Sequence, residues 1–129
     1  MELTPSLTID AARSAVEQRA TTAVALAETH YDRIQKENGQ INAFLTLSKE
    51  RALEHADRID RMVAEGKALP PLAGVPVGIK DVMSTRGVRT TASSKILEKY
   101  IPPFDCTAVA RLEAAGAVIL GKLNCDEFA

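Results

Sequence analysis

The sequence of 129 residues contains no tryptophan, only two cysteines and few aromatic residues, which make up 4% of the chain. Cys106 and Cys125 show no CxxC spacing and no accompanying histidine pair, so reduced thiols are expected rather than a zinc site or a redox couple. Neither sign of charge predominates, since 16 basic residues stand against 17 acidic ones. The interleaved charges give no basic stripe of the kind that binds nucleic acid.

Long apolar runs are also missing, because no stretch approaches the roughly 20 residues that span a bilayer. The first ten residues, MELTPSLTID, lack a basic region followed by an apolar run, so no secretory signal is expected. Hydrophobic residues make up 46% of the chain and charged residues 26%, which indicates a globular protein with a core. We therefore expect a soluble, cytoplasmic protein that does not enter a membrane.

Helical periodicity runs through most of residues 8–66, and it predicts three helices with an extended segment before the third. The expected features are a leading helix capped by Thr8, a second helix over residues 22–37 ended by Asn38 and Gly39, an extended segment over residues 41–47, and a third helix from Ser48 to Gly66.

Pro70 and Pro71 mark a change of pattern, which divides the chain into a helical segment, residues 1–69, and the beginning of an α/β core, residues 70–129. Later features are an edge-like strand at residues 75–79, a helix capped by Asp105, a buried parallel strand at residues 117–120, and the first turn of another helix at residues 124–129.

The predicted fold class is α/β, with N-terminal helices followed by the first strands and helix of a mixed or parallel sheet. With only two parallel strands, the strand at residues 117–120 is expected to leave an open edge. We therefore expect a truncated, association-prone piece of a larger fold.

Lys80 stands in the string LAGVPVGIKD, where an apolar strand meets a loop. Open α/β sheets gather their functional groups at such strand ends. In a dry site the ammonium loses solvation, so the neutral amine becomes accessible and can accept a proton from a hydroxyl nucleophile. Position alone does not separate this role from a solvated lysine paired with Asp81.

The longer context of Lys80 is more specific. The run LAGVPVGIKDVMSTRGVRTTASSKILEKYIPPFDCTAVARLEAAGAVILGKLNCDEFA resembles the N-terminal part of the amidase-signature family, and Lys80 matches the lysine of its GIKD motif. Within the family, ASSKILEKYIPPFDCTAVARL, GAVILGK and DEFA are most similar to the A subunit of tRNA-dependent amidotransferases.

The resemblance implies a serine, cis-serine and lysine triad that releases ammonia from glutamine, with Lys80 as its base. It also implies B and C subunits as partners and a misacylated tRNA as acceptor, with no cofactor in this chain and with ATP and Mg on a partner subunit. Both serines belong to a GGSSGGS-type stretch that does not occur in these 129 residues. Val82, Leu123 and Cys125 stand where the amidotransferase chain commonly has asparagine, threonine and methionine.

Three hypotheses remain open: the glutamine-hydrolysing chain of an amidotransferase, a stand-alone amidase that uses Lys80 in the same way, and a 129-residue chain that is catalytically inactive by itself. Other motifs favour structural roles. GAVILGK fails the P-loop pattern at Leu123 and is typical of a buried strand. Ser93, Ser94 and Lys95 suit a loop, and the charges over residues 50–61 suit a solvated helix face. His30 and His55 are expected in helices, without a metal.

Overall fold

The computed structural model describes residues 7–129. The expectation about a secretory signal rested on the first ten residues, and the first six of these lie outside the described part. The elements are α1 (Ile9–Glu17), α2 (Ala23–Ile41), β1 (Phe44–Leu47), α3 (Lys49–Ala64), β2 (Pro76–Lys80), the 3₁₀ turn η1 (Lys95–Leu97), α4 (Thr107–Ala114) and β3 (Val118–Leu123). No helix among residues 7–129 is both long and apolar enough to cross a membrane.

The three strands form one mixed sheet in the order β1-β3-β2. β3 pairs parallel with β2 and antiparallel with β1, which confirms the predicted α/β class with a mixed sheet. The expectation that the residue 117–120 strand has an open edge is wrong, because β1 returns from the N-terminal half to pair with it. β2 is the edge strand that Pro76 and Gly78 predicted.

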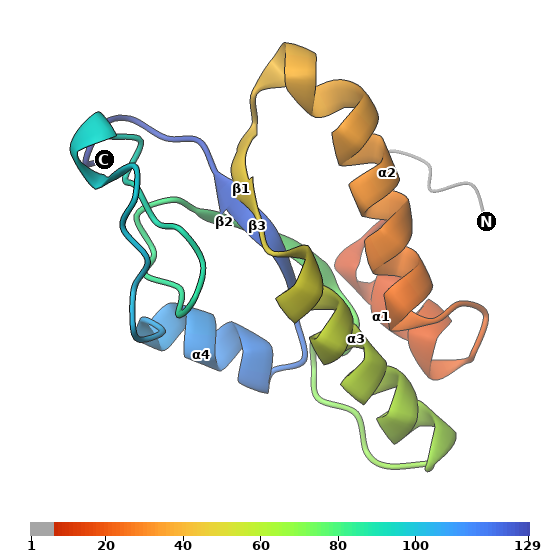
Figure 1. Cartoon of the computed structure of the whole chain (residues 1–129). Coiled ribbons are helices and arrows are strands. Elements are labelled where there is room, and N and C mark those ends of the chain that lie inside the picture. The colour runs from red at the N-terminus through yellow and green to blue at the C-terminus, as the bar shows by residue number, and fades with distance from the viewer. Residues whose placement is uncertain (1–6) are drawn as a thin grey trace.

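Helices cover both faces of this sheet (Figure 1). α1, α2 and α3 lie on one side and α4 on the other. The larger apolar cluster joins α1–α3 to Val75, Val118 and Leu120, and the smaller one joins α4 to the sheet through Val109, Ile79 and Ile119. The division at residue 70 stays a prediction; the larger cluster contains side chains from both sides of it.

Two helix predictions are wrong: the end of the second helix, and the helix expected over residues 124–129. α2 continues through Asn38 and Gly39 to Ile41, and it ends at Asn42, which has a left-handed φ of 56°. Asn38 does not stop the helix because its side-chain amide bonds both the N–H and the carbonyl of Phe44, at 2.8 and 2.9 Å, and so holds the start of β1. The expected helix over residues 124–129 is a turn, in which the N–H of Phe128 donates to Ala92.

The caps follow the sequence in part. Thr8 caps α1 by accepting from the N–H of Ala11 at 3.1 Å, as predicted. Ser48 precedes α3, but its hydroxyl donates to the carbonyl of Ile119 at 2.8 Å instead of capping the helix. Asp105 does not cap α4, whose N-cap is Cys106, because its carboxylate faces Arg51 and Arg86.

The parallel pairing of β2 with β3 contains an irregularity, since the register shifts between Val77 and Gly78. Leu120 occupies the extra position, and its carbonyl accepts from the Tyr31 hydroxyl at 2.8 Å and from the N–H of Ser48 at 3.0 Å. Burial raises the pKa of Tyr31 well above its ordinary value, so the hydroxyl stays a donor. α2 and the start of α3 therefore fix the bulge that precedes the strand ends.

Candidate active site

Lys80 is the last residue of β2 and lies opposite Leu123 of β3. The predicted position at a strand end is confirmed, and the C-terminal ends of the two parallel strands meet there. The side chain of Lys80 is exposed. Residues 7–129 therefore do not supply the dry surroundings that favour a neutral amine, and the catalytic role of Lys80 stays a prediction.

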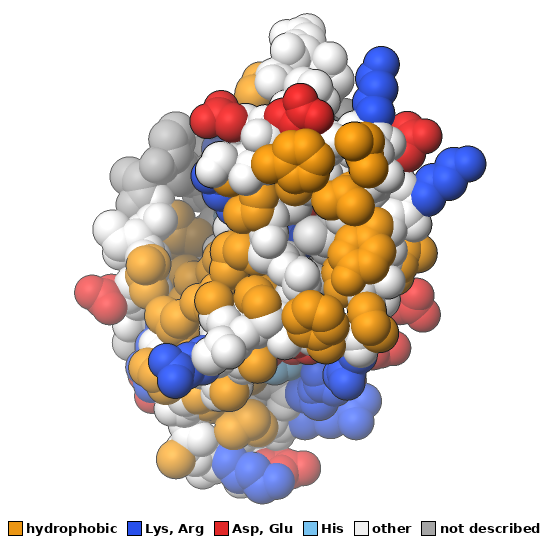
Figure 2. All heavy atoms as spheres, turned by 90° about the vertical axis from the view of Figure 1, so that its left-hand side faces the viewer, with side chains coloured by type: hydrophobic (Ala, Val, Ile, Leu, Met, Phe, Trp, Pro, Cys, Tyr) orange, Lys and Arg blue, Asp and Glu red, His pale blue; other side chains and the backbone are white. Residues whose placement is uncertain are grey.

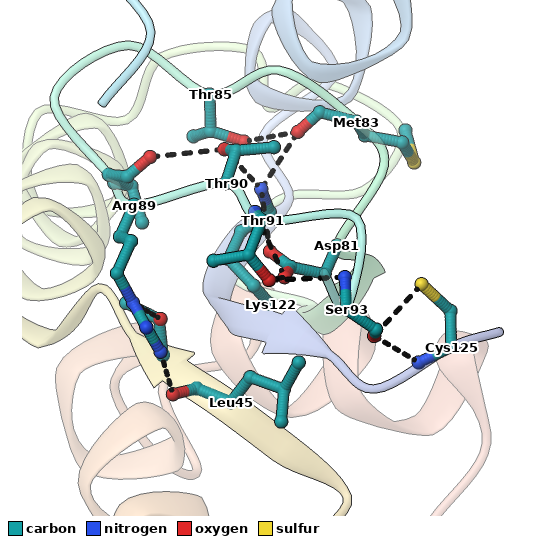
Figure 3. A network of polar contacts seen from close by, with 12 residues as sticks. Leu45, Asp81, Met83, Thr85, Arg89, Thr90, Thr91, Ser93, Lys122 and Cys125 are labelled. Carbon is teal, nitrogen blue, oxygen red and sulfur yellow. Dashed lines mark hydrogen bonds and ion pairs between the residues drawn. The ribbon is translucent and has the colours of Figure 1, made fainter. Parts of the chain in front are cut away.

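The next residue, Asp81, does not pair with Lys80. Its side chain is fully buried, and its carboxylate lies 3.5 Å from the amine of Lys122. One carboxylate oxygen accepts from both the N–H and the hydroxyl of Thr91. Asp81 therefore belongs to a polar network inside the protein (Figure 3), while its neighbour Lys80 reaches the surface.

Lys122 is a buried lysine on β3, at 0% exposure. Its amine donates to the carbonyl of Met83 at 2.8 Å and to the hydroxyl of Thr90 at 2.7 Å, and it faces Asp81. Burial lowers the pKa of Lys122, and the Asp81 carboxylate opposes that shift. Because its hydrogens point at these acceptors, the amine serves as a donor and an internal counter-charge.

Sequence reasoning missed Lys122. It interpreted GAVILGK correctly as a buried strand, which β3 confirms, but it drew no conclusion about the lysine. The signal was available, because lysine is almost never fully buried unless a partner neutralises it. A lysine that ends a continuous apolar run therefore predicts a buried acidic partner, and Asp81 is that partner.

The loop of residues 90–94 packs beside this network. Ala92 and Ser93 both have left-handed backbones, with φ of 50° and 54°. The Ser93 hydroxyl donates to Asn124 and accepts from the N–H of Cys125, and the Ser94 hydroxyl donates to Glu127. Both serines therefore hold the C-terminal turn to the loop, which confirms their predicted structural role.

Arg89, which directly precedes this loop, forms hydrogen bonds to the sheet. The Arg89 guanidinium donates to the carbonyl of Leu45 at 3.0 Å and to the hydroxyl of Thr46 at 2.9 Å, both on β1 (Figure 3). It also donates to the carbonyl of Glu98 at 3.1 Å. β1 and the loop thus hold each other in place at the edge of the site.

The interpretation of residues 50–61 as a solvated helix face is wrong for Arg51, which is partly buried. Its guanidinium bonds Glu113 of α4 and Asp105, at 2.7 and 2.9 Å. Burial alone would raise the pKa of Asp105, but hydrogen bonds from Arg51 and from the N–H of Arg86 outweigh it and hold the pKa below its ordinary range. This cluster joins the start of α3 to α4.

Two histidines and two cysteines lie among residues 7–129. His30 lies in α2 and His55 in α3, as predicted, and both cysteines are free and partly buried. Among residues 7–129, no group of three or more His, Cys, Asp and Glu side chains is placed to hold a metal ion. The site therefore consists of exposed Lys80 above the buried network of Asp81 and Lys122.

Comparison with known proteins shows the family of the chain. The sequence profile of the family described as Amidase matches residues 25–129. The chain belongs to the amidase-signature family. Among curated relatives of this amidase-family chain, the A subunit of glutamyl-tRNA(Gln) amidotransferase from Koribacter versatilis (strain Ellin345) is 63% identical over 95% of the chain. Its counterpart from Roseiflexus sp. (strain RS-1) is 51% identical over 100% of the chain.

Each of these two relatives is covered over 26% of its own length, so the chain spans about a quarter of them. Solved structures have the same fold as this chain. The peptide amidase from Stenotrophomonas maltophilia superposes with a TM-score of 0.90 at 28% identity, over 97% of this chain and 26% of that one. A second structure superposes with a TM-score of 0.87 at 43% identity, over 90% of this chain and 26% of that one. It is described as a vestigial protein complex that reveals the evolutionary origins of an s-triazine catabolic enzyme. The predicted family and fold are confirmed.

Proposed function

We propose that the full-length protein hydrolyses glutamine and supplies ammonia for the ATP-dependent conversion of Glu-tRNA(Gln) to Gln-tRNA(Gln), or of Asp-tRNA(Asn) to Asn-tRNA(Asn). The observation that carries this proposal is the 63% identity, over 95% of the chain, to the A subunit of a glutamyl-tRNA(Gln) amidotransferase. The location of Lys80 at the end of a parallel strand supports it.

In the proposed mechanism, neutral Lys80 is the base. Lys80 accepts a proton from a bridging serine, which in turn deprotonates the nucleophilic serine. That serine attacks the carboxamide carbon of glutamine, backbone N–H groups stabilise the oxyanion, and ammonia leaves with the returned proton. Water then releases glutamate from the acyl-enzyme. The two serines would come from a Gly/Ser-rich stretch outside these 129 residues.

Lys80 must lose water contacts before it can act, because water stabilises the charged ammonium over the neutral amine. In the proposal, parts of the full-length protein outside this chain cover the exposed side chain of Lys80. ATP and Mg would bind on a partner subunit. Within this chain, GAVILGK leads into β3, and Lys122 bonds Met83 and Thr90 inside the protein. The complex would comprise A, B and C subunits in the cytoplasm.

The test replaces Lys80 with alanine in the complete amidotransferase. Loss of a general base should reduce ammonia release from glutamine by about 100-fold or more. Lys99→Ala, at an exposed lysine of the same chain, is the matched control and should leave turnover unchanged. Near-normal ammonia release by the Lys80→Ala enzyme would refute the assignment.

A second candidate function is amide hydrolysis by a lone chain. The TM-score of 0.90 with the S. maltophilia peptide amidase favours it, and so does Val82, which stands where the amidotransferase chain often has asparagine. Lys80 would be the base there too. Purification decides between them: two co-purifying subunits and glutamine-dependent transamidation support the first function, and hydrolysis of a small amide by the single chain supports the second.

A further inference from the structure

Lys80 is an exposed residue between two buried ones. Ile79 is 3% exposed and packs with Val109 and Ile119 beneath α4. Asp81 is 0% exposed and lies in the polar network. The Cα of Lys80 is therefore held by an apolar contact on one side and by polar contacts on the other.

The polar contacts begin at the backbone of Asp81. Its N–H donates to the carbonyl of Leu123 at 2.9 Å, and its carbonyl accepts from the N–H of Ala92 at 2.9 Å. The backbone of Asp81 is thus fastened to β3 through its N–H and to the residue 90–94 loop through its carbonyl. A shift of Asp81 would move the root of the Lys80 side chain with it.

The side chains of Asp81 and Lys122 complete the arrangement (Figure 3). Asp81 binds Thr91 through one oxygen, and its other oxygen faces the Lys122 amine at 3.5 Å without a closer donor among residues 7–129. Lys122 also bonds the carbonyl of Met83, whose N–H donates to the carbonyl of Lys80 at 3.0 Å. One buried amine therefore holds the turn after Lys80, the carboxylate beside it and, through Thr90, the neighbouring loop.

We infer that the buried Asp81–Lys122 pair is a positioning device for Lys80: it fixes the backbone from which the catalytic amine extends and docks the residue 90–94 loop beside it. Neither residue touches the reacting atoms. The inference rests on the proposed role of Lys80. The pair should affect kcat and not KM for glutamine, because the distance between the base and the proton determines the rate of proton transfer.

The chemistry of the pair supports positioning over packing. Burying two charges is costly, and apolar residues of the same volume would fill the space as stably. Apolar side chains, however, would give no directed contact to Met83, Thr90 and Thr91, whose polar groups lie on two separate turns. Directed hydrogen bonds hold these turns in one relative orientation.

The test uses the complete amidotransferase with two variants. Asp81→Asn/Lys122→Met replaces both charges together, so no unpaired charge is buried. Thr91→Val removes one hydroxyl that bonds Asp81 and leaves the ion pair intact. We expect both variants to keep the melting temperature within a few degrees and KM for glutamine within about twofold, while kcat falls by about 10- to 100-fold. Lys36→Met, on the exposed face of α2, is the control.

The outcomes separate the two proposals. Folded variants with wild-type kcat, or with a raised KM at unchanged kcat, overturn the positioning role. If the double variant does not fold, Thr91→Val decides alone. Lys80→Ala is measured in the same preparation: if it stays active, the proposed function fails, whereas an inactive Lys80→Ala beside fully active Asp81 and Thr91 variants sinks only the positioning role.

Discussion

A lysine with no exposed surface needs its counter-charge, and this dependence gives a stability prediction for Lys122. Lys122→Met alone leaves the Asp81 carboxylate buried without a cation, so the free energy of unfolding should fall by about 3–5 kcal/mol. Urea unfolding followed by circular dichroism measures the change. Lys36→Met, at an exposed lysine, should change stability by less than about 0.5 kcal/mol. Equal stabilities for the two variants would contradict the pairing.

His55 gives a pH prediction. Burial lowers its pKa below the ordinary 6.5, an effect that Glu113 opposes and that Arg58 and Arg51 reinforce. The unfolded chain therefore binds the proton first as the pH falls, and stability is lost below about pH 6.5. Urea unfolding at pH 7.5 and at pH 5.5 should show a smaller loss for His55→Gln than for the wild type. An identical loss would show that His55 does not contribute.

At the scale of single residues, sequence reasoning found Lys80 because a strand end and a motif both mark it. It could not find the partners of Asp81, since Lys122 lies 41 positions away and adjacent Lys80 offered a simpler pairing. Which of two lysines faces a carboxylate depends on the side of the strand that each occupies. That side is fixed by the fold and not by distance along the chain.

Among the elements, α3 and α4 are joined by Arg51. Arg51→Met removes charge-assisted bonds to Glu113 and Asp105, so the free energy of unfolding should fall by about 1.5–3 kcal/mol. The matched control is Arg33→Met, whose pair with Glu37 is on an exposed face of α2, and the expected loss there is below about 0.5 kcal/mol. Thermal unfolding of both variants compares them directly, and similar losses would refute the bridging role.

The pairing of β1 with β3 depends on Gly121. A Cβ at this position would collide with the carbonyl oxygen of Thr46, which is backbone and cannot move without displacing β1. Gly121→Ala should therefore destabilise the chain by about 1–3 kcal/mol. In Gly78→Ala the nearest atoms to the new methyl group belong to the flexible Leu123 side chain, at 3.0 Å, so the cost should be smaller. Denaturant midpoints rank the two variants, and the reverse order would contradict the close approach.

Local patterns predicted most of the elements. The Thr8 cap, the third helix and the edge-like strand before Lys80 all follow from spacing and capping, and the structure confirms them. The missed features are long-range. β1 pairs with a strand about 75 residues later in the chain, and Asn38 continues a helix because it bonds Phe44. Neither tertiary contact leaves a local periodic signal.

At the scale of the whole molecule, most of the large exposed apolar side chains of residues 7–129 belong to two segments. Residues 96–104 and the C-terminal turn lie on the side seen in Figure 2, where hydrophobic groups form a broad surface. Five large exposed side chains belong to these segments: Ile96, Tyr100, Ile101, Phe104 and Phe128. Such surfaces mark contact sites or promote association. We therefore expect any association to use this surface, since β1 covers the edge of β3 that the sequence left open.

This surface gives a prediction for the 129-residue chain. At micromolar concentration the chain should self-associate, and Ile96→Ser/Phe104→Ser should shift it towards monomer in sedimentation velocity. Ile9→Ser/Ile41→Ser changes two other exposed apolar side chains, on α1 and at the end of α2, so it controls for lost hydrophobicity alone. If both double variants dissociate to the same extent, the surface is not the cause.

The single-residue offset between Lys80 and Asp81 limits how this part of the gene can vary. Inserting one codon before Lys80 would move the amine into the buried position of Asp81, among the threonines, and deleting the codon of Ile79 would move the carboxylate into the exposed position of Lys80. A change in the number of residues between Gly78 and Asp81 should therefore disturb the site even where no side chain of the pair is replaced. Alignments of functional full-length homologues should therefore be free of gaps across this run.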